Sequence, residues 1–341
     1  MGMAVPRPWQ VRQTLERGAR RVRERASVLH WDRGGAEDAV LLLGSGRSGT
    51  TWVGQLLHDG NAMRDVFEPF HALKTPALRG RALYPYARPS DRDAELQAVY
   101  GAILAGLVRG PWTDRFNRRR FARKRLIKDI RMNAMLPWLS ERFPSIPRVW
   151  LVRHPCAVVE SRLALGWDSH LDDYLAQPAF VEDHLDPHVD RVRAAQEDPL
   201  EAHAVSWCLE NLAAWRCRGP KTATPVFFER LKTNLAAEAE RLCVSVGLAP
   251  PRRLERLDRT PSPLRGARSP MLTGADPVTA WRDRLSASQV DRVLSQVSAF
   301  GLDRLYDDAP LPKPQGLAAG VAPAALGGET SSPERKRREA A

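Results

Sequence analysis

The chain has few cysteines and no long uninterrupted apolar segment. Its 341 residues include only Cys156, Cys208, Cys217 and Cys243, and no two are spaced as a CxxC pair. We therefore expect reduced, buried thiols in a cytoplasmic protein rather than a disulfide framework or a zinc site. No stretch of about 18 apolar residues is present, which argues against a membrane span. Residues 1–40 also lack the apolar core of a secretory signal peptide.

The formal net charge of +12 is unevenly distributed. A solvated basic helix or loop is the simplest interpretation of its densest cluster, and an anionic substrate, a membrane surface and nucleic acid are the alternatives. We expect no nucleic-acid partner. The cluster comprises Arg109, Arg115, Arg118, Arg119, Arg120, Arg123, Lys124, Arg125, Lys128 and Arg131.

The two ends of the chain differ in composition from the part between them. In residues 1–37, apolar side chains recur at helical intervals among many arginines, which predicts a basic amphipathic helix. That helix either docks on the domain or makes peripheral contact with an anionic membrane. Residues 309–341 are rich in Pro, Gly and Ala, and we expect a disordered tail. Residues 38–308 then form one α/β domain.

The central motif is an apolar run that leads into a glycine-rich turn. Residues 39–43 read Ala-Val-Leu-Leu-Leu, the turn follows, and Trp52 and Val53 begin a helical pattern. A strand, loop and helix of this kind cradle phosphate, because backbone amides and the helix amino end face the anion. The residues expected to bind the anion are Gly46, Arg47, Ser48, Gly49, Thr50 and Thr51.

The loop lacks the lysine of nucleotide-hydrolysing P-loop proteins. Thr50 stands at that position, and Arg47 is the local cation. A loop without the lysine is poorly suited to a triphosphate with magnesium and better suited to a smaller anion. A P-loop kinase or NTPase therefore remains an alternative function, and a non-enzymatic basic binding protein is another.

Further apolar strands alternate with helices. Residues 66–71, 126–131 and 148–155 read as strands, which predicts a P-loop-type, three-layer sandwich with a central, mostly parallel sheet flanked by helices. Arg153 ends the third strand and Ser161 lies on the following helix, so the two can converge on one anion. We also expect a strand over 225–231.

Together, the loop and the stretch from Val152 to Ser161 resemble the sulfotransferases that use PAPS (3′-phosphoadenosine 5′-phosphosulfate). The arginine form of the loop and the Phe67-Glu68-Pro69 segment are more similar to the carbohydrate-type and bacterial branch than to the cytosolic phenol and steroid enzymes. The resemblance implies that the loop, with Arg47 as its cation, holds the 5′-phosphosulfate. It also implies that Arg153 and Ser161 hold the 3′-phosphate.

The resemblance also suggests catalytic residues. The cytosolic enzymes carry Lys-Thr-His where this chain has Lys128-Asp129-Ile130, so the lysine is retained and the base lies elsewhere. Glu68 is the expected base, with His71 in reserve, and Lys128 stabilises charge on the bridging oxygen. The implied reaction is metal-free, in-line transfer to a hydroxyl or amine of a carbohydrate, glycolipid or small molecule.

Two segments nearer the carboxyl end complete the expectations. Residues 168–201 are acidic and predict a mobile lid over the acceptor. A metal site at His184 and His188 is disfavoured, because Pro187 breaks the helix that would align them. Ser286 and Gln289 form a capping-box pattern at the start of a final helix.

Overall fold

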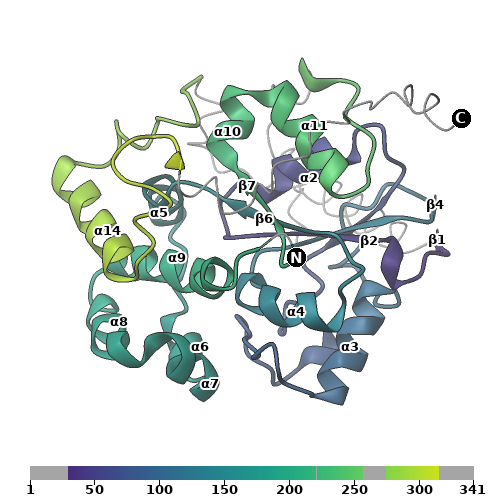
Figure 1. The fold of residues 1–341 in the computed structure, drawn as a ribbon, viewed down its shortest axis with the longest axis horizontal. Coiled ribbons are helices and arrows are strands. Elements are labelled where there is room, and N and C mark those ends of the chain that lie inside the picture. The colour runs from purple at the N-terminus through teal and green to yellow at the C-terminus, as the bar shows by residue number, and fades with distance from the viewer. Residues whose placement is uncertain (1–29, 220, 256–273, 315–341) are drawn as a thin grey trace, which may run out of the picture.

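A five-stranded parallel sheet lies at the centre of the computed structural model, which describes residues 30–219, 221–255 and 274–314 (Figure 1). The strand order is β3-β5-β2-β6-β7, and every neighbouring pair is parallel. The predicted α/β fold with a mostly parallel sheet is therefore confirmed. The strands are β2 (Ala39–Gly44), β3 (Arg64–Phe67), β5 (Arg125–Asp129), β6 (Arg148–Val152) and β7 (Thr224–Phe227).

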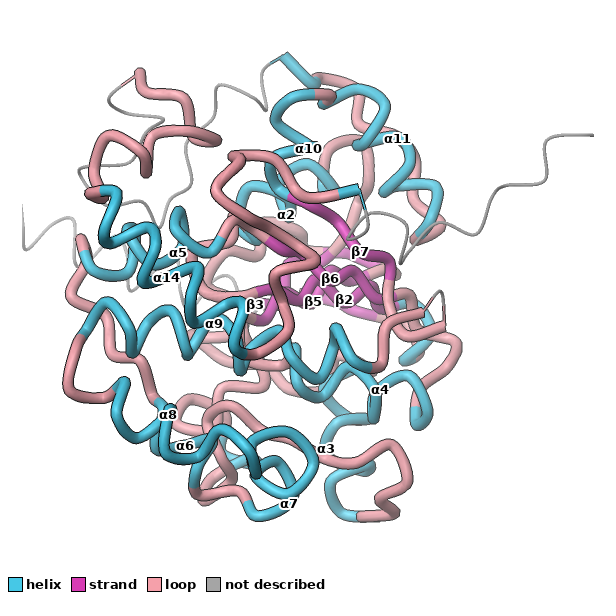
Figure 2. Tube along the Cα trace, turned by 60° about the vertical axis from the view of Figure 1, so that its left-hand side comes forward, coloured by secondary structure: helices cyan, strands magenta, loops and turns pink. Residues whose placement is uncertain are grey.

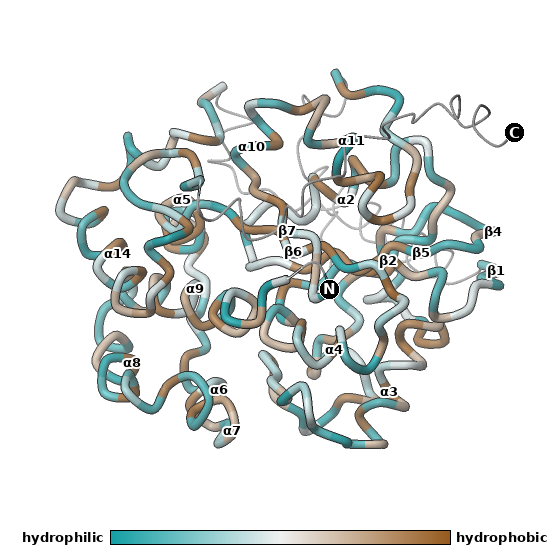
Figure 3. The backbone as a smooth tube through the Cα atoms, viewed as in Figure 1, coloured by the Kyte–Doolittle hydropathy of each residue, from teal (hydrophilic) through white to brown (hydrophobic). Residues whose placement is uncertain are grey.

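Strand β2 is buried on both faces, as its apolar run requires. Alternate side chains point to opposite faces of a strand, so Val40 and Leu42 join one apolar cluster while Leu41 and Leu43 join another. In Figure 3 hydrophobic stretches of the trace lie along the central strands, between the helices. Because β2 lies between β5 and β6, the loop that follows it is flanked by the carboxyl ends of both neighbours.

Helices cover the sheet on both faces, giving three layers (Figures 1 and 2). The Val40 and Leu42 face packs against α2 (Thr50–His58), α10 (Phe228–Thr233) and α11 (Leu235–Ser245). The opposite face packs against α3 (Ala94–Leu104), α4 (Leu136–Arg142) and α9 (Pro199–Arg216). A smaller cluster joins α9 to α5 (Pro155–Leu163) and α14 (Ala287–Ala299). Among the described residues, no helix has the length and apolarity needed to cross a bilayer.

The segment expected to be a mobile lid is a packed part of the domain. It forms the short helices α6 (Leu171–Leu175), α7 (Pro178–Phe180) and α8 (Val189–Ala195). Phe180, Leu185 and Val192 are fully buried in the cluster that contains α9. Their burial anchors the segment, so the expectation of a long lid loop was wrong.

Several expected boundaries also differ. Strand β7 ends at Phe227, because Phe228 starts α10, so the expected strand over 225–231 is only half strand. Strand β3 ends at Phe67, so Glu68 follows the strand instead of lying within it. Strand β5 separates β3 from β2, which means that β3 does not neighbour the loop strand.

The chain ends are only partly described. The helix expected over 1–37 lies outside the described residues up to position 29, and beyond it Trp31–Asp32 form strand β1 and Ala36–Asp38 a 3₁₀ turn. At the other end, Lys313 donates its backbone N–H to the Leu305 carbonyl, and residues 315–341 lie outside the described part. All four cysteines are free thiols, but Cys217 is exposed, contrary to the expectation that all are buried.

Candidate functional site

The loop after β2 has a backbone that only certain residues allow. Gly49 has φ 98°, and a Cβ there would lie 2.7 Å from the Phe228 ring, so both conformation and space require glycine. Arg47 adopts φ 75° without being glycine, a conformation that costs free energy and is concentrated at functional sites. The Oγ atom of Ser48 is buried and has no hydrogen-bond partner among the residues that the structure describes. The loop therefore offers an unsatisfied polar atom inside a constrained turn.

A buried ion pair that the sequence analysis missed supports this loop. Arg162 on α5 donates from Nε and Nη2 to the Gly46 carbonyl, at 3.2 and 3.1 Å. Glu210 on α9 accepts from the same guanidinium at 2.9 and 2.8 Å. Asn211 donates to the Ser45 hydroxyl at 3.1 Å. Helix α9 thus fixes the loop from behind, and no local motif in α9 signals this contact.

Arg47, Arg153 and Ser161 form one hydrogen-bonded group beside the loop. Arg47 Nε donates to Ser161 Oγ at 3.0 Å, and Arg153 Nη1 donates to the Arg47 carbonyl at 3.0 Å. Arg153 Nη2 donates to the Pro277 carbonyl at 2.9 Å, while its buried Nε has no hydrogen-bond partner in residues 30–219, 221–255 and 274–314.

Electrostatics at this cluster favour a bound anion. Burial and the charge of Arg153 lower the pKa of Arg47, and burial lowers the pKa of Arg153. A buried guanidinium disfavoured in this way gains stability from a nearby negative charge. The arrangement is therefore able to bind a phosphate or sulfate group.

Glu68 lies between two cations at the end of the neighbouring strands. Lys128 Nζ and Arg131 Nη1 each donate to a different Glu68 carboxylate oxygen at 2.8 Å. Burial alone would raise the pKa of Glu68, but the charges of Lys128 and Arg131 outweigh it and hold the pKa below its ordinary value. Glu68 itself has φ 42°. The sequence analysis named Glu68 and Lys128 but not Arg131 as part of this group.

His71, the reserve base, lies near Glu68 in the chain and shares a neighbour with it. Its ring meets Trp112 edge-on at 5.5 Å, and the Trp112 indole N–H donates to the Glu68 carbonyl at 3.1 Å. The His71 Nδ1 atom is buried without a hydrogen-bond partner. Burial and the charge of Arg131 lower the pKa of His71 to about 4, so the imidazole is neutral at pH 7.

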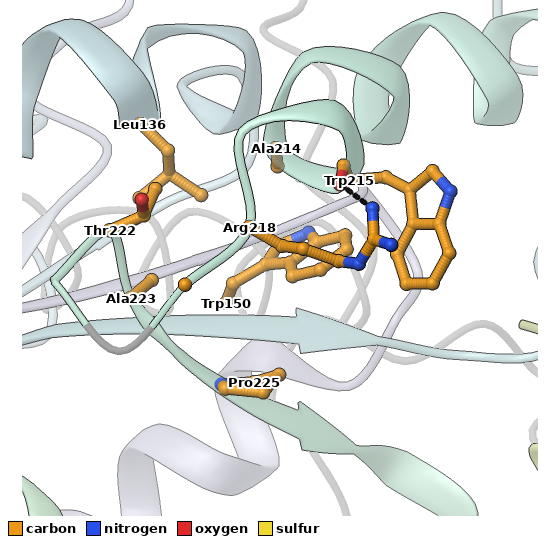
Figure 4. Close-up of a pocket in the computed structure, with 9 residues that line it drawn as sticks. Leu136, Trp150, Ala214, Trp215, Arg218, Thr222, Ala223 and Pro225 are labelled. Carbon is orange, nitrogen blue, oxygen red and sulfur yellow. Dashed lines mark hydrogen bonds between the residues drawn. The ribbon is translucent and has the colours of Figure 1, made fainter. Parts of the chain in front are cut away.

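An apolar pocket lies apart from these residues (Figure 4). Trp150, Leu136 and Pro225 are among the residues that line it, and Arg218 covers one side with its guanidinium 3.8 Å from the Trp215 ring centre. None of the predicted site residues lines this pocket. Trp150 nevertheless donates to Asn211 at 3.1 Å, so the pocket wall connects to the residue that holds Ser45.

The histidines considered as metal ligands lie in separate surroundings. His184 Nδ1 is 3.0 Å from the Arg216 guanidinium, and His188 packs against the Phe300 ring. Within residues 30–219, 221–255 and 274–314, no group of three or more His, Cys, Asp or Glu side chains is placed to hold a metal ion.

Comparison with known proteins gives one family and several similar structures. A sulfotransferase domain from the curacin biosynthetic pathway is 15% identical with a TM-score of 0.41, covering 79% of this chain and 99% of that domain. The sulfotransferase domain of an olefin synthase from Synechococcus PCC 7002 is 15% identical with a TM-score of 0.38, covering 80% and 96%. A sulfotransferase from Alicyclobacillus acidocaldarius is 15% identical with a TM-score of 0.35, covering 79% and 99%.

No curated protein matches the chain. The model of the sulfotransferase family matches residues 39–251, which include the loop, Glu68, Lys128, Arg153 and Ser161. This match spans more than half of the chain. The protein therefore belongs to the sulfotransferase family.

Proposed function

We propose that this sulfotransferase moves a sulfuryl group from PAPS to a hydroxyl or amine of a carbohydrate, glycolipid or small molecule. The proposal assigns metal-free, in-line transfer to the domain of residues 38–308. One observation carries it: within the described part of the chain, the buried Ser48 Oγ and Arg153 Nε both lack a hydrogen-bond partner beside the contact between Arg47 and Ser161. A buried polar atom left unpaired costs about 1–3 kcal/mol, so a ligand that pairs both atoms is favoured.

The residues beside the loop fit the two charged ends of PAPS. The loop amides of residues 46–49, the Arg47 guanidinium and the hydroxyls of Thr50 and Thr51 would hold the 5′-phosphosulfate. Arg153 and Ser161 would hold the 3′-phosphate, and Arg153 Nε is available to donate to it. Because ATP lacks a 3′-phosphate, this contact would select PAPS over ATP.

Glu68 and its partner Lys128 are placed so that binding of the donor could promote removal of the acceptor's proton. PAPS, when bound, supplies an activated sulfuryl group on a phosphate leaving group. Lys128 donates to Glu68, and because its ammonium has three N–H donors, it would also serve an oxygen of the bound donor. As Lys128 neutralises charge there, its hold on Glu68 weakens and the pKa of Glu68 rises towards the value of an effective base. Glu68 then accepts the proton of the acceptor hydroxyl or amine.

The cofactor is tested by thermal unfolding with 3′,5′-bisphosphoadenosine, PAPS, ADP and Mg-ATP in parallel. A ligand at about a hundred times its Kd adds about 2.7 kcal/mol of stability, which is a shift of a few degrees. We expect stabilisation by the two 3′-phosphorylated nucleotides. Stabilisation by Mg-ATP alone would overturn the proposal in favour of a P-loop kinase.

The base is tested with Glu68→Gln, which keeps the size of the side chain. We expect turnover of labelled PAPS to fall by about 10²- to 10⁴-fold, while bisphosphoadenosine affinity stays nearly constant. His71→Gln is the matched control, because it removes the other candidate base. If Glu68→Gln retains turnover and His71→Gln loses it, the role passes to His71.

A further inference from the structure

Three large apolar side chains lie exposed together at the amino ends of the strands. Trp31 on β1 and Phe121 on β4 (Phe121–Ala122) are 57% and 76% exposed, and Leu107 is 71% exposed. β1 and β4 are parallel with Trp31 opposite Phe121, and directly opposed residues share one face of a ribbon. The side chain of Asp32, the next residue of β1, points inward and is buried. Trp31 and Phe121 therefore form one outward-facing aromatic pair.

Hydrogen bonds bring Leu107 beside this pair. Arg64 donates to the Gly106 carbonyl at 2.7 Å and to Asp32 at 3.0 Å. One guanidinium therefore holds together Gly106, which precedes Leu107, and Asp32, which follows Trp31. Arg109 donates to the His30 carbonyl at 3.0 Å, which joins the same two segments again. We call Trp31, Leu107 and Phe121, with the cations around them, the docking surface.

The cations of the docking surface are exposed and little compensated. The guanidinium of Arg33 lies 5.1 Å from the Trp31 ring centre. Of the neighbouring acids, Asp32 and Asp114 are buried in ion pairs with Arg64, and Asp38 is 3.6 Å from Arg123. The surface thus combines apolar side chains with positive charge. Its exposed cations include Arg33, Arg109, Arg118, Arg119, Arg120 and Arg123.

We propose that the docking surface binds an anionic lipid bilayer. Tryptophan and phenylalanine insert at the boundary between headgroups and acyl chains, and arginines bind anionic headgroups there. Residues 1–29 directly precede the surface and contain seven arginines against two glutamates, which adds further attraction to an anionic membrane. The docking surface is distinct from the sequence-predicted amphipathic helix, because it lies on the folded domain.

Two other occupants fit less well. Trp31 and Phe121 could each stack on a base of single-stranded nucleic acid, but Leu107 has no ring for stacking and would be left without an apolar partner. A second copy of the chain would bring two positively charged surfaces together, which costs free energy. An anionic bilayer satisfies both the apolar and the charged part of the surface.

The orientation keeps docking separate from the proposed sulfuryl transfer. β1 and β4 lie at the right-hand end of Figure 1, and α5, which carries Ser161, lies towards the left. The donor site is at the carboxyl ends of the strands, and the docking surface is at their amino ends. A docked molecule therefore exposes the donor site to the aqueous phase, and the inference does not depend on the identity of the donor.

The test is co-sedimentation of the full chain with phosphatidylcholine vesicles, with and without phosphatidylserine. We expect binding only to the anionic vesicles. Trp31→Ala/Phe121→Ala should weaken binding by at least about tenfold, and Arg119→Gln/Arg120→Gln by about fivefold for each cation. The matched controls are Val244→Ala, which removes an apolar side chain that is 67% exposed, and Arg193→Gln on α8.

Wild-type-like binding by both double variants would overturn the proposal, as would equal binding to neutral vesicles. If the double variants instead lose binding to a single-stranded oligonucleotide, the surface is assigned to nucleic acid. If they lose a dimer that the wild type forms in solution, the surface is assigned to a second copy of the chain. Each variant is also assayed for thermal unfolding and for its shift with bisphosphoadenosine. An unchanged unfolding temperature and an unchanged shift with bisphosphoadenosine show that the fold and the donor site are intact. If Trp31→Ala/Phe121→Ala does not fold, Phe121→Ala alone takes its place.

Discussion

The two ends of the central sheet both contain buried arginines, but one arginine at the carboxyl end differs from the others in its partners. At the amino end, Arg64 donates to Asp114 and Asp32 and to the carbonyls of Gly106 and Val108. Arg125 is paired with Asp32 at 2.7 Å and donates to three carbonyls besides. At the carboxyl end, Arg162 is paired with Glu210, whereas Arg153 donates only to carbonyls and its Nε has no partner among the described residues.

This difference separates structural from functional charge. A buried arginine with a full set of acceptors fixes the segments that supply them, and removing it strands a buried carboxylate. A buried arginine without a carboxylate partner stores unfavourable free energy that an anionic ligand can recover. The acceptors around each guanidinium thus distinguish the arginines that stabilise the fold, such as Arg64 and Arg162, from Arg153, which we propose binds the donor.

The largest effect is expected from breaking the amino end. Arg64→Met removes the arginine partner of the buried Asp114 and one of the two arginine partners of Asp32, and it should lower the free energy of unfolding by about 3–5 kcal/mol, measured by urea unfolding. Arg79→Met, at an exposed arginine, is the control and should change stability by less than about 0.5 kcal/mol. A loss below about 1 kcal/mol for Arg64→Met would show that its contacts do not stabilise the fold.

A smaller effect is expected at the carboxyl end, where a substitution should lower ligand affinity and not stability. Arg153→Met should leave the stability of the ligand-free protein nearly unchanged, because no carboxylate loses a direct partner. Affinity for 3′,5′-bisphosphoadenosine should fall roughly 10- to 100-fold, as expected for a lost charged hydrogen bond. Calorimetric titration with AMP is the control, since AMP lacks the 3′-phosphate. Equal losses for both nucleotides would remove the proposed role.

The smallest effect is a difference in pH dependence. His154 accepts a hydrogen bond at Nδ1 from the Cys156 N–H, and burial lowers its pKa to about 4. Between pH 4 and about 6.5 the unfolded chain binds the extra proton, so stability falls as pH falls through this window, by at most about 1.4 kcal/mol per pH unit. His154→Phe should flatten the slope of urea-unfolding free energy against pH, and an unchanged slope would contradict this.

The amino end should respond only at lower pH. Burial raises the pKa of Asp32, but hydrogen bonds from Arg125 and Arg64 outweigh burial and keep the pKa below the ordinary 3.8. Its contribution to stability is present above that value and is lost only below it. Hydrogen exchange at pH 5 should therefore show loss of protection at the start of α5 before any loss in β5.

Local patterns made part of this structure predictable. The apolar run and glycines predicted β2, the loop and α2, because each requirement lies within a few residues. The capping box is confirmed: Gln289 N–H donates to Ser286 Oγ at 3.2 Å, and Ser286 N–H donates to Gln289 at 2.9 Å. Arg47, Arg153 and Ser161 meet because β2 and β6 are neighbours with aligned carboxyl ends.

Contacts between distant segments were not predictable. The φ of 42° at Glu68 accompanies its ion pairs with Lys128 on β5 and with Arg131 just after β5, which no pattern around Glu68 reveals. The apolar run through Phe228 continues past the end of β7, so it cannot show where α10 begins. The contact between Glu210 and Arg162 joins positions 48 residues apart, and only the tertiary fold brings them together.

The left-handed backbone at Arg47 and Glu68 has a consequence for engineering. Residues other than glycine cost about 1 kcal/mol or more in this conformation, so glycine or asparagine in place of Arg47 should make the ligand-free fold more stable. The same replacement of Glu68 would leave the buried Lys128 and Arg131 without their carboxylate, which costs more than the backbone gains. Selection for heat resistance alone would therefore favour replacing the arginine to which we assign donor binding, and a thermostable variant library of this chain should hold position 47 fixed.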